Sequence, residues 1–248
     1  MIRIVDLSKS FGAKRVLDGL SLEIETGETM VIIGQSGSGK SVLLKLLIGI
    51  LTPDCGEIFI DGTNATALAR DERQRLTRKF GMLFQGAALF DSMTVAQNVA
   101  FGLERYSDLT RAKVRAKVTE SLELVGLRGV EHLMPFELSG GMKKRVGLAR
   151  AIAYAPEIML YDEPSTGIDP IRADAINELI LMLKREMRVT SVVITHDITS
   201  ASKVADRMAM LYLGRIIAVG TPDEFRRSSN AVVQQFIHGR AEGPIKTW

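Results

Sequence analysis

A short apolar run leads directly into a glycine-rich loop near the start of the chain. The run, TMVII at residues 29–33, is mostly β-branched, which is typical of a strand buried on both faces. The loop, GQSGSGKS at Gly34–Ser41, fits the phosphate-binding pattern G-x-x-x-x-G-K-[ST] in full. A helix-like stretch, residues 41–50, follows it. A buried strand, a phosphate loop and a helix in this order predict an α/β fold.

Each part of this loop suits a triphosphate. Glycines let the backbone curl so that its N–H groups converge on an anion. The helix that follows adds the positive end of its dipole. Lys40 is expected to neutralise the β- and γ-phosphates, and the Ser41 hydroxyl to bind Mg²⁺. The predicted nucleotide contacts are therefore the loop and the residue after it: Gly34, Gln35, Ser36, Gly37, Ser38, Gly39, Lys40, Ser41 and Val42.

An acidic pair follows a second predicted strand, residues 158–161. Asp162 ends this strand, where it can reach a metal ion, and Glu163 comes next. Attack on a γ-phosphate needs an aligned water, and a carboxylate beside the metal can polarise that water. Such a pair on its own could simply end a strand. Its place downstream of a phosphate loop favours Asp162 as a metal ligand and Glu163 as the catalytic carboxylate.

The first and middle thirds of the chain differ in their hydrophobic patterns. Apart from the phosphate loop and the helix after it, the first third predicts strands, and the dipeptide Asp61-Gly62 is a strong turn signal. The middle third predicts two helices, one with Thr110 as N-cap and a stop at Gly126, the other beginning near Ser139. The charged stretch 70–79 predicts a solvated helix.

The last third alternates strand and helix again. Asp169 and Pro170 form an N-cap and first-turn pair for an amphipathic helix. A buried strand is predicted at 192–195, and a hairpin around Leu213-Gly214. The whole pattern is a βαβ core interrupted by a helical insert, and the tail after residue 239 has no core signal.

Composition is that of a globular protein, with 46% apolar and 25% charged residues in 248. A formal net charge of +3 favours a solvated surface over attraction to an anionic membrane or a nucleic acid. Cys55 is the single cysteine, so no internal disulfide can form and the reducing cytosol is expected. No targeting segment is visible, and no apolar run reaches the ~18 residues that a membrane span needs. Any membrane association is expected to come through a partner.

LSGGM at Leu138–Met142 resembles the signature motif of the ABC family, which usually ends in Gln. The resemblance implies a P-loop NTPase with a RecA-like ABC ATPase core, an N-terminal antiparallel β-subdomain and an inserted α-helical subdomain. The resemblance also implies a single domain at residues 1–240. Within it, residues 1–88 and 157–225 would form the core and residues of about 89–156 the helical subdomain. Residues 225–248 would form a C-terminal tail.

The same resemblance assigns Ser139, Gly140 and Gly141 to a second anion site, which faces the ATP of the opposite subunit in a head-to-tail dimer. Ser139 can also be a simple helix N-cap, and both interpretations can hold at once. Met142 in place of Gln puts the contact of that side chain in doubt, but not the anion site.

Other positions match the family one at a time. Phe11 lies where an aromatic ring stacks on adenine, with Val16 nearby, although Phe11 alone would more often be a core residue. Gln85 resembles the glutamine that touches Mg²⁺ or the attacking water and senses the membrane partner. Asp169 resembles the aspartate that communicates across the dimer, with its N-cap role an equal alternative. His196 resembles the histidine that contacts the γ-phosphate. The expected catalytic set is Glu163, His196, Lys40 and Gln85; the expected metal ligands are Ser41, Gln85 and Asp162.

Three longer segments, FGMLFQGAALFDSMTVAQNVAF, LSGGMKKRVGLARAIA and FIHGRAEGPI, look like the ATPase subunit of Mla/MCE-type phospholipid-transport systems. This narrower resemblance implies an integral-membrane permease, an MCE-domain partner, a STAS-domain protein and a phospholipid substrate moved between the inner and outer membranes. It places the subunit at the cytoplasmic face of the inner membrane. The alternatives are an ABC ATPase for another substrate, a nucleic-acid-associated ABC ATPase and, least favoured, a P-loop kinase.

Two further clusters have competing interpretations. The apolar residues Leu89, Phe90, Met93 and Val95 would contact the permease, although packing of the helical insert explains them equally well. The basic residues of the signature helix are expected to form its exposed face: Lys143, Lys144, Arg145 and Arg150.

Overall fold

The computed structural model describes residues 1–246. It contains two compact units. The first unit consists of residues 1–77 together with the chain from residue 190 onward, and the second unit is Arg78–Val189. The boundaries predicted from the sequence at residues 88, 157 and 225 stay predictions.

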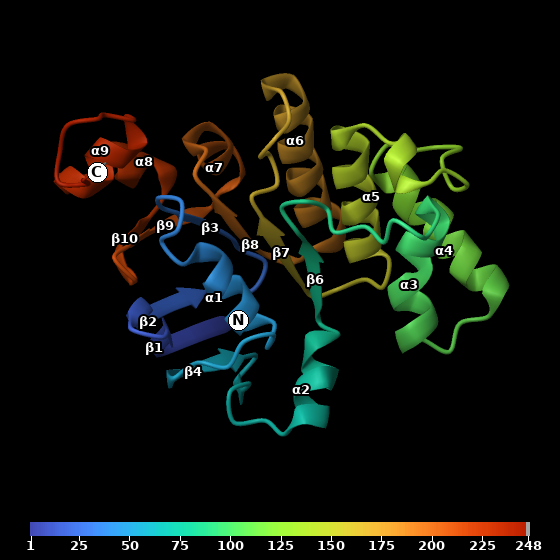
Figure 1. Ribbon diagram of the computed structural model, residues 1–248, viewed down its shortest axis with the longest axis horizontal. Coiled ribbons are helices and arrows are strands. Elements are labelled where there is room, and N and C mark those ends of the chain that lie inside the picture. The colour runs from blue at the N-terminus through green and yellow to red at the C-terminus, as the bar shows by residue number, and fades with distance from the viewer. Residues whose placement is uncertain (247–248) are drawn as a thin grey trace. The chain divides into compact units, whose positions relative to one another are not determined.

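The first unit contains a mostly parallel arrangement of four strands (Figure 1). β3 (Thr29–Ile33) is fully buried and pairs in parallel with β8 (Thr190–Thr195) and with β9 (Arg207–Tyr212). β10 (Arg215–Gly220) pairs antiparallel with β9. The predicted buried strands and the C-terminal hairpin are confirmed. The loops that follow β3 and β8 leave at the same edge, because parallel strands end on one side.

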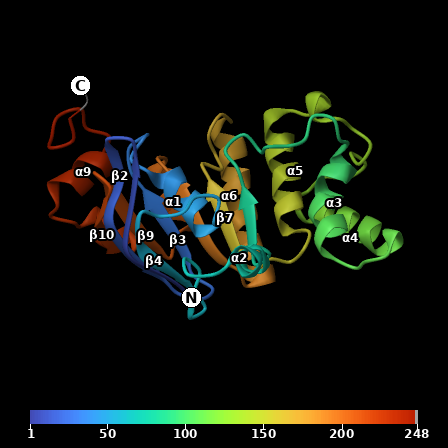
Figure 2. The ribbon, with the colours of Figure 1, turned by 60° about the horizontal axis from the view of Figure 1, so that its bottom comes forward.

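A second, antiparallel sheet completes the first unit, with the order β2-β1-β4-β5. Two of its strands, β2 and β4, are labelled in Figure 2. Its strands are β1 (Ile2–Phe11), β2 (Lys14–Ile24), β4 (Cys55–Ile60) and β5 (Thr63–Asn64). Asp61 and Gly62 form the turn between β4 and β5 with φ angles of +48° and +80°, as the turn signal predicts. This sheet is the predicted N-terminal β-subdomain.

The helices of the first unit are short. α1 (Lys40–Leu47) ends before the predicted limit, because the chain turns at Gly49 with φ +73°. α2 (Arg70–Thr77) has no buried residue, which confirms the predicted solvated helix. The remaining helices are α7 (Ile198–Val204), α8 (Pro222–Arg226) and α9 (Ala231–Ile237).

The C-terminal tail is more ordered than its sequence pattern predicts. Ile245 is only 4% exposed, and the buried Gln235 side chain bonds both of its backbone groups. The Ile245 N–H donates to Gln235 Oε1 over 2.6 Å, and Gln235 Nε2 donates to the Ile245 carbonyl over 3.0 Å. The expectation of a tail without a core signal is therefore wrong for this segment. Residues 247–248 of the predicted tail lie outside the described residues.

The second unit joins two parallel strands, β6 (Phe80–Leu83) and β7 (Ile158–Asp162), to a group of helices. α3 (Val95–Tyr106), α4 (Arg111–Leu124) and α5 (Gly140–Ile152) pack against one another (Figure 1). A 3₁₀ turn (Pro135–Glu137) precedes α5, and α6 (Pro170–Met187) follows β7. Among residues 1–246, no helix combines the length and the apolar character needed to cross a bilayer.

Candidate functional site

The phosphate loop leaves the buried end of β3 and is tightly packed at two glycines. A Cβ on Gly34 would lie 2.4 Å from the carbonyl oxygen of Leu211, so a side chain does not fit there. Gly39 has φ +106°, and a Cβ on it would lie 2.9 Å from Val16 Cγ1. These contacts place Val16 beside the loop and fix the curl of the backbone. The contact of Val16 with the nucleotide stays a prediction.

Lys40 is held inside this curl. Its side chain is only 5% exposed, and its ammonium donates to the carbonyl oxygens of Gly34 over 2.7 Å and of Gln35 over 3.0 Å. The charge therefore lies against the loop itself. Lys40 is positioned for an anion that the loop encloses.

Two observations show that the loop fits a phosphate group. The first turn of α1 has no side-chain cap and no acidic residue, so its N–H groups face the loop as donors for an anion. The Ser38 hydroxyl oxygen is buried and has no hydrogen-bond partner among the described residues. A buried hydroxyl without a partner is costly, and a phosphate oxygen would satisfy it.

His196 and the phosphate loop lie at the same strand edge. Ile33 and Thr195 are partners in the parallel register of β3 and β8, so Gly34 and His196 each begin the next loop. His196 is exposed, and the chain then enters α7, whose N-cap Asp197 accepts from the Thr199 N–H over 3.0 Å. The register supports the predicted role of His196 at the nucleotide.

Phe11 is not a core residue. It ends β1 with 48% of its surface exposed, and the Lys9 ammonium lies 5.7 Å from the centre of its ring. An exposed ring on a strand end can stack on a planar base. The adenine contact predicted for Phe11 stays a prediction, and the core alternative is wrong.

Asp162 and Glu163 lie at the buried end of β7 in the second unit, each 8% exposed. Glu163 has φ +49°, which is unusual for a residue with a side chain. The Thr166 hydroxyl donates to Glu163 Oε2 over 3.1 Å, and the Thr166 N–H donates to the Glu163 carbonyl over 3.2 Å. Thr166 thus orients the proposed catalytic carboxylate. No sequence motif singles out Thr166, although its place three residues after Glu163 could have suggested a local turn.

The signature segment opens α5 as the sequence predicts. Ser139 is the N-cap, and its hydroxyl accepts from the Met142 N–H over 3.3 Å. Gly140 is exposed, and a Cβ on Gly141 would meet only the Arg172 side chain, 3.6 Å away. The N-cap role is confirmed. The contact of these residues with a nucleotide of another subunit stays a prediction.

Asp169 also serves as an N-cap, here for α6. It accepts from the Arg172 N–H over 3.0 Å and forms an ion pair with the Arg172 guanidinium at 3.3 Å. Asp169 itself is exposed. Because Arg172 also approaches Gly141, the loop of Asp169 lies beside the start of the signature helix. The role of Asp169 across a dimer stays a prediction.

The loop after Gln85 is fastened to the signature helix. Ala87 and Ala88 have φ angles of +62° and +47°. The Arg150 guanidinium donates to their carbonyl oxygens, over 2.7 Å to Ala87 and 2.6 Å to Ala88. Burial lowers the pKa of Arg150. Gln85 remains exposed on this fixed loop.

These contacts correct two expectations. The basic residues of α5 do not form an exposed face: Lys144 is 5% exposed, Arg150 binds the Gln85 loop, and Arg145 donates to the Val125 carbonyl over 3.1 Å. Val95 is fully buried in the core of the helices, so it does not serve a surface contact with a permease. Phe90 contacts the Phe101 ring in a tilted arrangement, with ring centres 4.7 Å apart, and is still 41% exposed.

Replacing Arg150 with alanine should lower stability. Two carbonyls in positive-φ conformations would lose charge-assisted donors, each worth about 1.5–3 kcal/mol. We expect unfolding free energy to fall by about 2–4 kcal/mol, measured by urea denaturation. Lys143→Ala on the same helix is the control and should change stability by less than about 0.5 kcal/mol. Equal stability of the two variants would contradict the role of Arg150.

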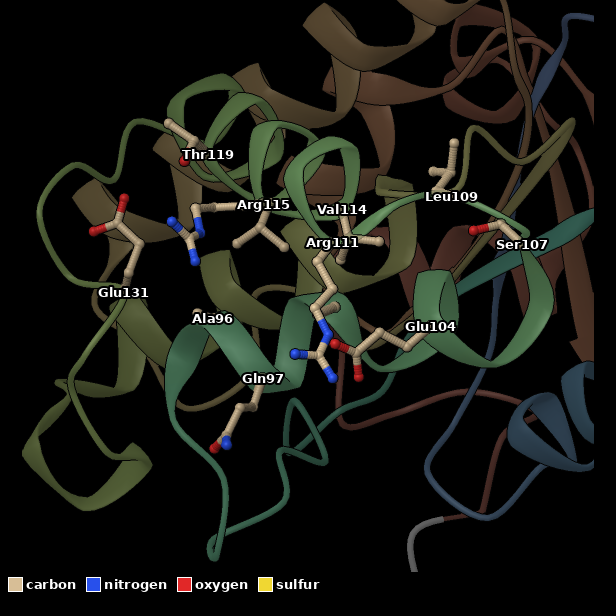
Figure 3. Close-up of a pocket in the computed structure, with 12 residues that line it drawn as sticks. Ala96, Gln97, Glu104, Ser107, Leu109, Arg111, Val114, Arg115, Thr119 and Glu131 are labelled. Carbon is tan, nitrogen blue, oxygen red and sulfur yellow. The ribbon is translucent and has the colours of Figure 1, made fainter.

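A separate hollow lies between α3 and α4, with a volume of about 770 Å³ (Figure 3). Apolar residues of both helices line it, and its charged residues are Glu104, Arg111, Arg115 and Glu131. None of the predicted site residues lines this hollow. Sequence patterning did not indicate it, because its lining residues come from separate elements.

The family profile described as ABC transporter matches residues 17–166, which include the phosphate loop, the signature segment and the acidic pair. The chain belongs to the ABC transporter family. As an ABC ATPase, it binds and hydrolyses ATP.

The chain is 42% identical over 244 residues to the probable ribonucleotide transport ATP-binding protein Mkl of Mycobacterium leprae, covering 98% of this chain and 70% of Mkl. It is 39% identical over 245 residues to the intermembrane phospholipid transport system ATP-binding protein MlaF of Escherichia coli, covering 99% of this chain and 91% of MlaF. The ATP-binding cassette MJ0796, in a dimeric post-hydrolysis state bound to ADP and Pi, is 31% identical with a TM-score of 0.83, covering 90% of this chain and 99% of MJ0796. These likenesses confirm the predicted fold class: a P-loop ABC ATPase core with an antiparallel β-subdomain and a helical subdomain.

Proposed function

We propose that this ATPase drives the transport of phospholipid between two membranes. The observation that supports the proposal most is the 39% identity to MlaF along 99% of this chain, which includes the C-terminal segment. Identity of that extent covers more than the ATP-binding motifs that all ABC ATPases share. MlaF serves intermembrane phospholipid transport, so the same cargo is proposed here.

The proposed roles follow the residues of each unit. Gly34–Ser41 bind the phosphates, and His196 contacts the γ-phosphate. Glu163 polarises the attacking water, with its carboxylate oriented by Thr166. Phe11 stacks on the adenine.

Mg²⁺ is proposed to bind through Ser41, Gln85, Asp162 and the nucleotide itself. Mg²⁺ typically uses one or two protein carboxylates, with phosphate oxygens and water completing its shell. Such a site needs no dense group of acidic residues. In the described part of the chain, no group of three or more His, Cys, Asp or Glu side chains is placed to hold a metal ion. When bound, the ion would neutralise charge on the phosphates.

The subunit is proposed to act as a head-to-tail dimer on an integral-membrane permease. The dimeric state of MJ0796 supports the dimer, and the system to which MlaF belongs supports a membrane complex. In the dimer, Ser139, Gly140, Gly141 and Asp169 would face the nucleotide of the partner subunit. MCE-domain and STAS-domain subunits complete the proposed assembly, which lies at the cytoplasmic face of the inner membrane.

The cargo can be tested on the intact complex. The protein would be purified from membranes with its partners, the partners identified, and the complex placed in lipid nanodiscs. We expect a permease to co-purify, and added glycerophospholipid to raise the rate of ATP hydrolysis. A complex carrying Glu163→Gln gives the background rate.

The comparison with Mkl supplies the competing cargo, because that relative is named for ribonucleotide transport at similar identity. Stimulation by ribonucleotides and not by lipid would overturn the phospholipid proposal. Salt-sensitive binding to nucleic acid, with no permease present, would favour the nucleic-acid-associated alternative instead.

A further inference from the structure

Lys144 is a buried cation on the signature helix. It lies five residues after the N-cap Ser139 and is 5% exposed. Its ammonium donates to the main-chain carbonyl of Glu163 over 3.2 Å. Burying an ammonium costs several kcal/mol unless it is well paired, so its partners determine why the fold retains it.

The residue that Lys144 bonds is Glu163, which is proposed to polarise the attacking water. Glu163 has φ +49°, a conformation that costs about 1–3 kcal/mol in a residue with a side chain and persists only where its surroundings hold it. Its carbonyl accepts from both the Lys144 ammonium and the Thr166 N–H, and its carboxylate accepts from the Thr166 hydroxyl. Two of these hydrogen bonds therefore hold the Glu163 main chain at its carbonyl, and the third holds its side chain.

The charges around Lys144 agree with this arrangement. The pKa of Lys144 lies below its ordinary value because the side chain is buried, and the negative charges of Glu163 and Asp162 oppose part of that lowering. The ammonium thus lies in the field of both carboxylates. It also bonds the main-chain carbonyl of Glu163 directly after β7.

We propose that Lys144 is a positioning residue for ATP hydrolysis, which links the signature helix to the Glu163 main chain. The proposal rests on the proposed role of Glu163. α5 begins at Ser139 and Gly140, the residues proposed to face the nucleotide of the partner subunit. A displacement of α5 when the dimer closes would reach Glu163 through Lys144, and the carboxylate would align with water only when α5 is in place.

A purely structural cation would behave differently from a positioning residue. Loss of a structural cation lowers the fraction of folded protein and leaves the turnover of each folded molecule unchanged. Loss of a positioning residue lowers kcat while ATP affinity stays the same, because displacement of a catalytic group by about 1 Å can cost up to about 100-fold in rate.

The test compares Lys144→Met, which keeps the length and removes the ammonium, with Lys144→Arg, which keeps a cation. Lys143→Met, one position earlier on α5, is the matched control. We expect Lys144→Met to lower kcat about 10- to 100-fold with a KM for ATP within about twofold of the original. Lys144→Arg should have a kcat between those of Lys144→Met and the original protein. Lys143→Met should have the kcat of the original protein. Rates are expressed per ATP-binding molecule, well below the melting temperature of each variant.

Each remaining outcome counts against a specific claim. An unchanged kcat per folded molecule in Lys144→Met, with Glu163→Gln inactive, would overturn the role of Lys144 alone. A parallel loss in Lys143→Met would also overturn it. An active Glu163→Gln would instead remove the role of Glu163 on which the proposal rests. If Lys144→Met cannot be purified, Lys144→Gln supports the same comparison with a neutral side chain.

Discussion

Replacing Glu163 with glutamine is expected to lower ATP turnover by about 100- to 10,000-fold and to leave ATP binding intact. The amide has the size of the carboxylate and can still accept from the Thr166 hydroxyl, so the local structure should persist. It cannot take a proton from water, which removes general-base assistance. Phosphate release gives the rate, and calorimetric titration with ATP gives the affinity.

Glu157→Gln is the matched control for that substitution. Glu157 lies one residue before β7, is exposed and forms a surface ion pair with Lys79 at 2.8 Å. A surface pair of this kind contributes little, so its turnover should equal that of the original protein. With ATP present, Glu163→Gln should also accumulate as a dimer in size-exclusion chromatography. Normal turnover in Glu163→Gln would mean that another group activates the water.

The parts of this site that are predictable from the sequence depend on local chemistry. Ser139, Asp169 and Thr110 cap their helices because a short polar side chain can reach the backbone N–H three residues on, whatever surrounds it. The mostly β-branched run at 29–33 is buried on both faces as predicted, because every residue after Thr29 in it is apolar. The curl of the phosphate loop is also a local property, because it depends on the glycines within the loop itself.

The inward contacts of the cations Lys144 and Arg150 on α5 were not predictable in this way. Lys144 bonds a carbonyl 19 positions away, and Arg150 bonds two carbonyls 62 and 63 positions away. Those acceptors belong to Glu163, Ala87 and Ala88, which have positive φ angles. Neither glutamate nor alanine indicates a positive φ from the sequence. Long basic side chains on a helix usually reach solvent, and only the tertiary structure shows that these two turn inward.

The buried position of Ile245 in the C-terminal tail was not predictable for a similar reason. Gln235 lies on α9 and looks like a surface residue, yet its amide pairs with both backbone groups of Ile245. One buried isoleucine among glycine, proline and charged residues gives no periodicity to detect. Pairing between a side chain and a distant backbone must be seen in the structure.

Lys40→Ala is expected to lower the affinity for ATP by about 100-fold or more. The ammonium is predicted to contact the β- and γ-phosphates, and charge-assisted hydrogen bonds are worth about 1.5–3 kcal/mol each. Loss of two such bonds is at least about 3 kcal/mol, which corresponds to about a hundredfold in Kd. Equilibrium titration with a fluorescent ATP analogue and with unlabelled ATP as competitor measures the change.

Lys45→Ala supplies the comparison that makes this result specific. Lys45 lies on the same helix, is exposed and carries the same charge, so its removal tests the general electrostatic attraction of α1 for an anion. Its effect on affinity should stay within about threefold, because an exposed charge is well screened by salt. In Lys40→Ala the carbonyls of Gly34 and Gln35 also lose their donor, so the loop itself should loosen. Equal affinities in the two variants would show that the charge of α1, and not the enclosed ammonium of Lys40, binds the phosphates.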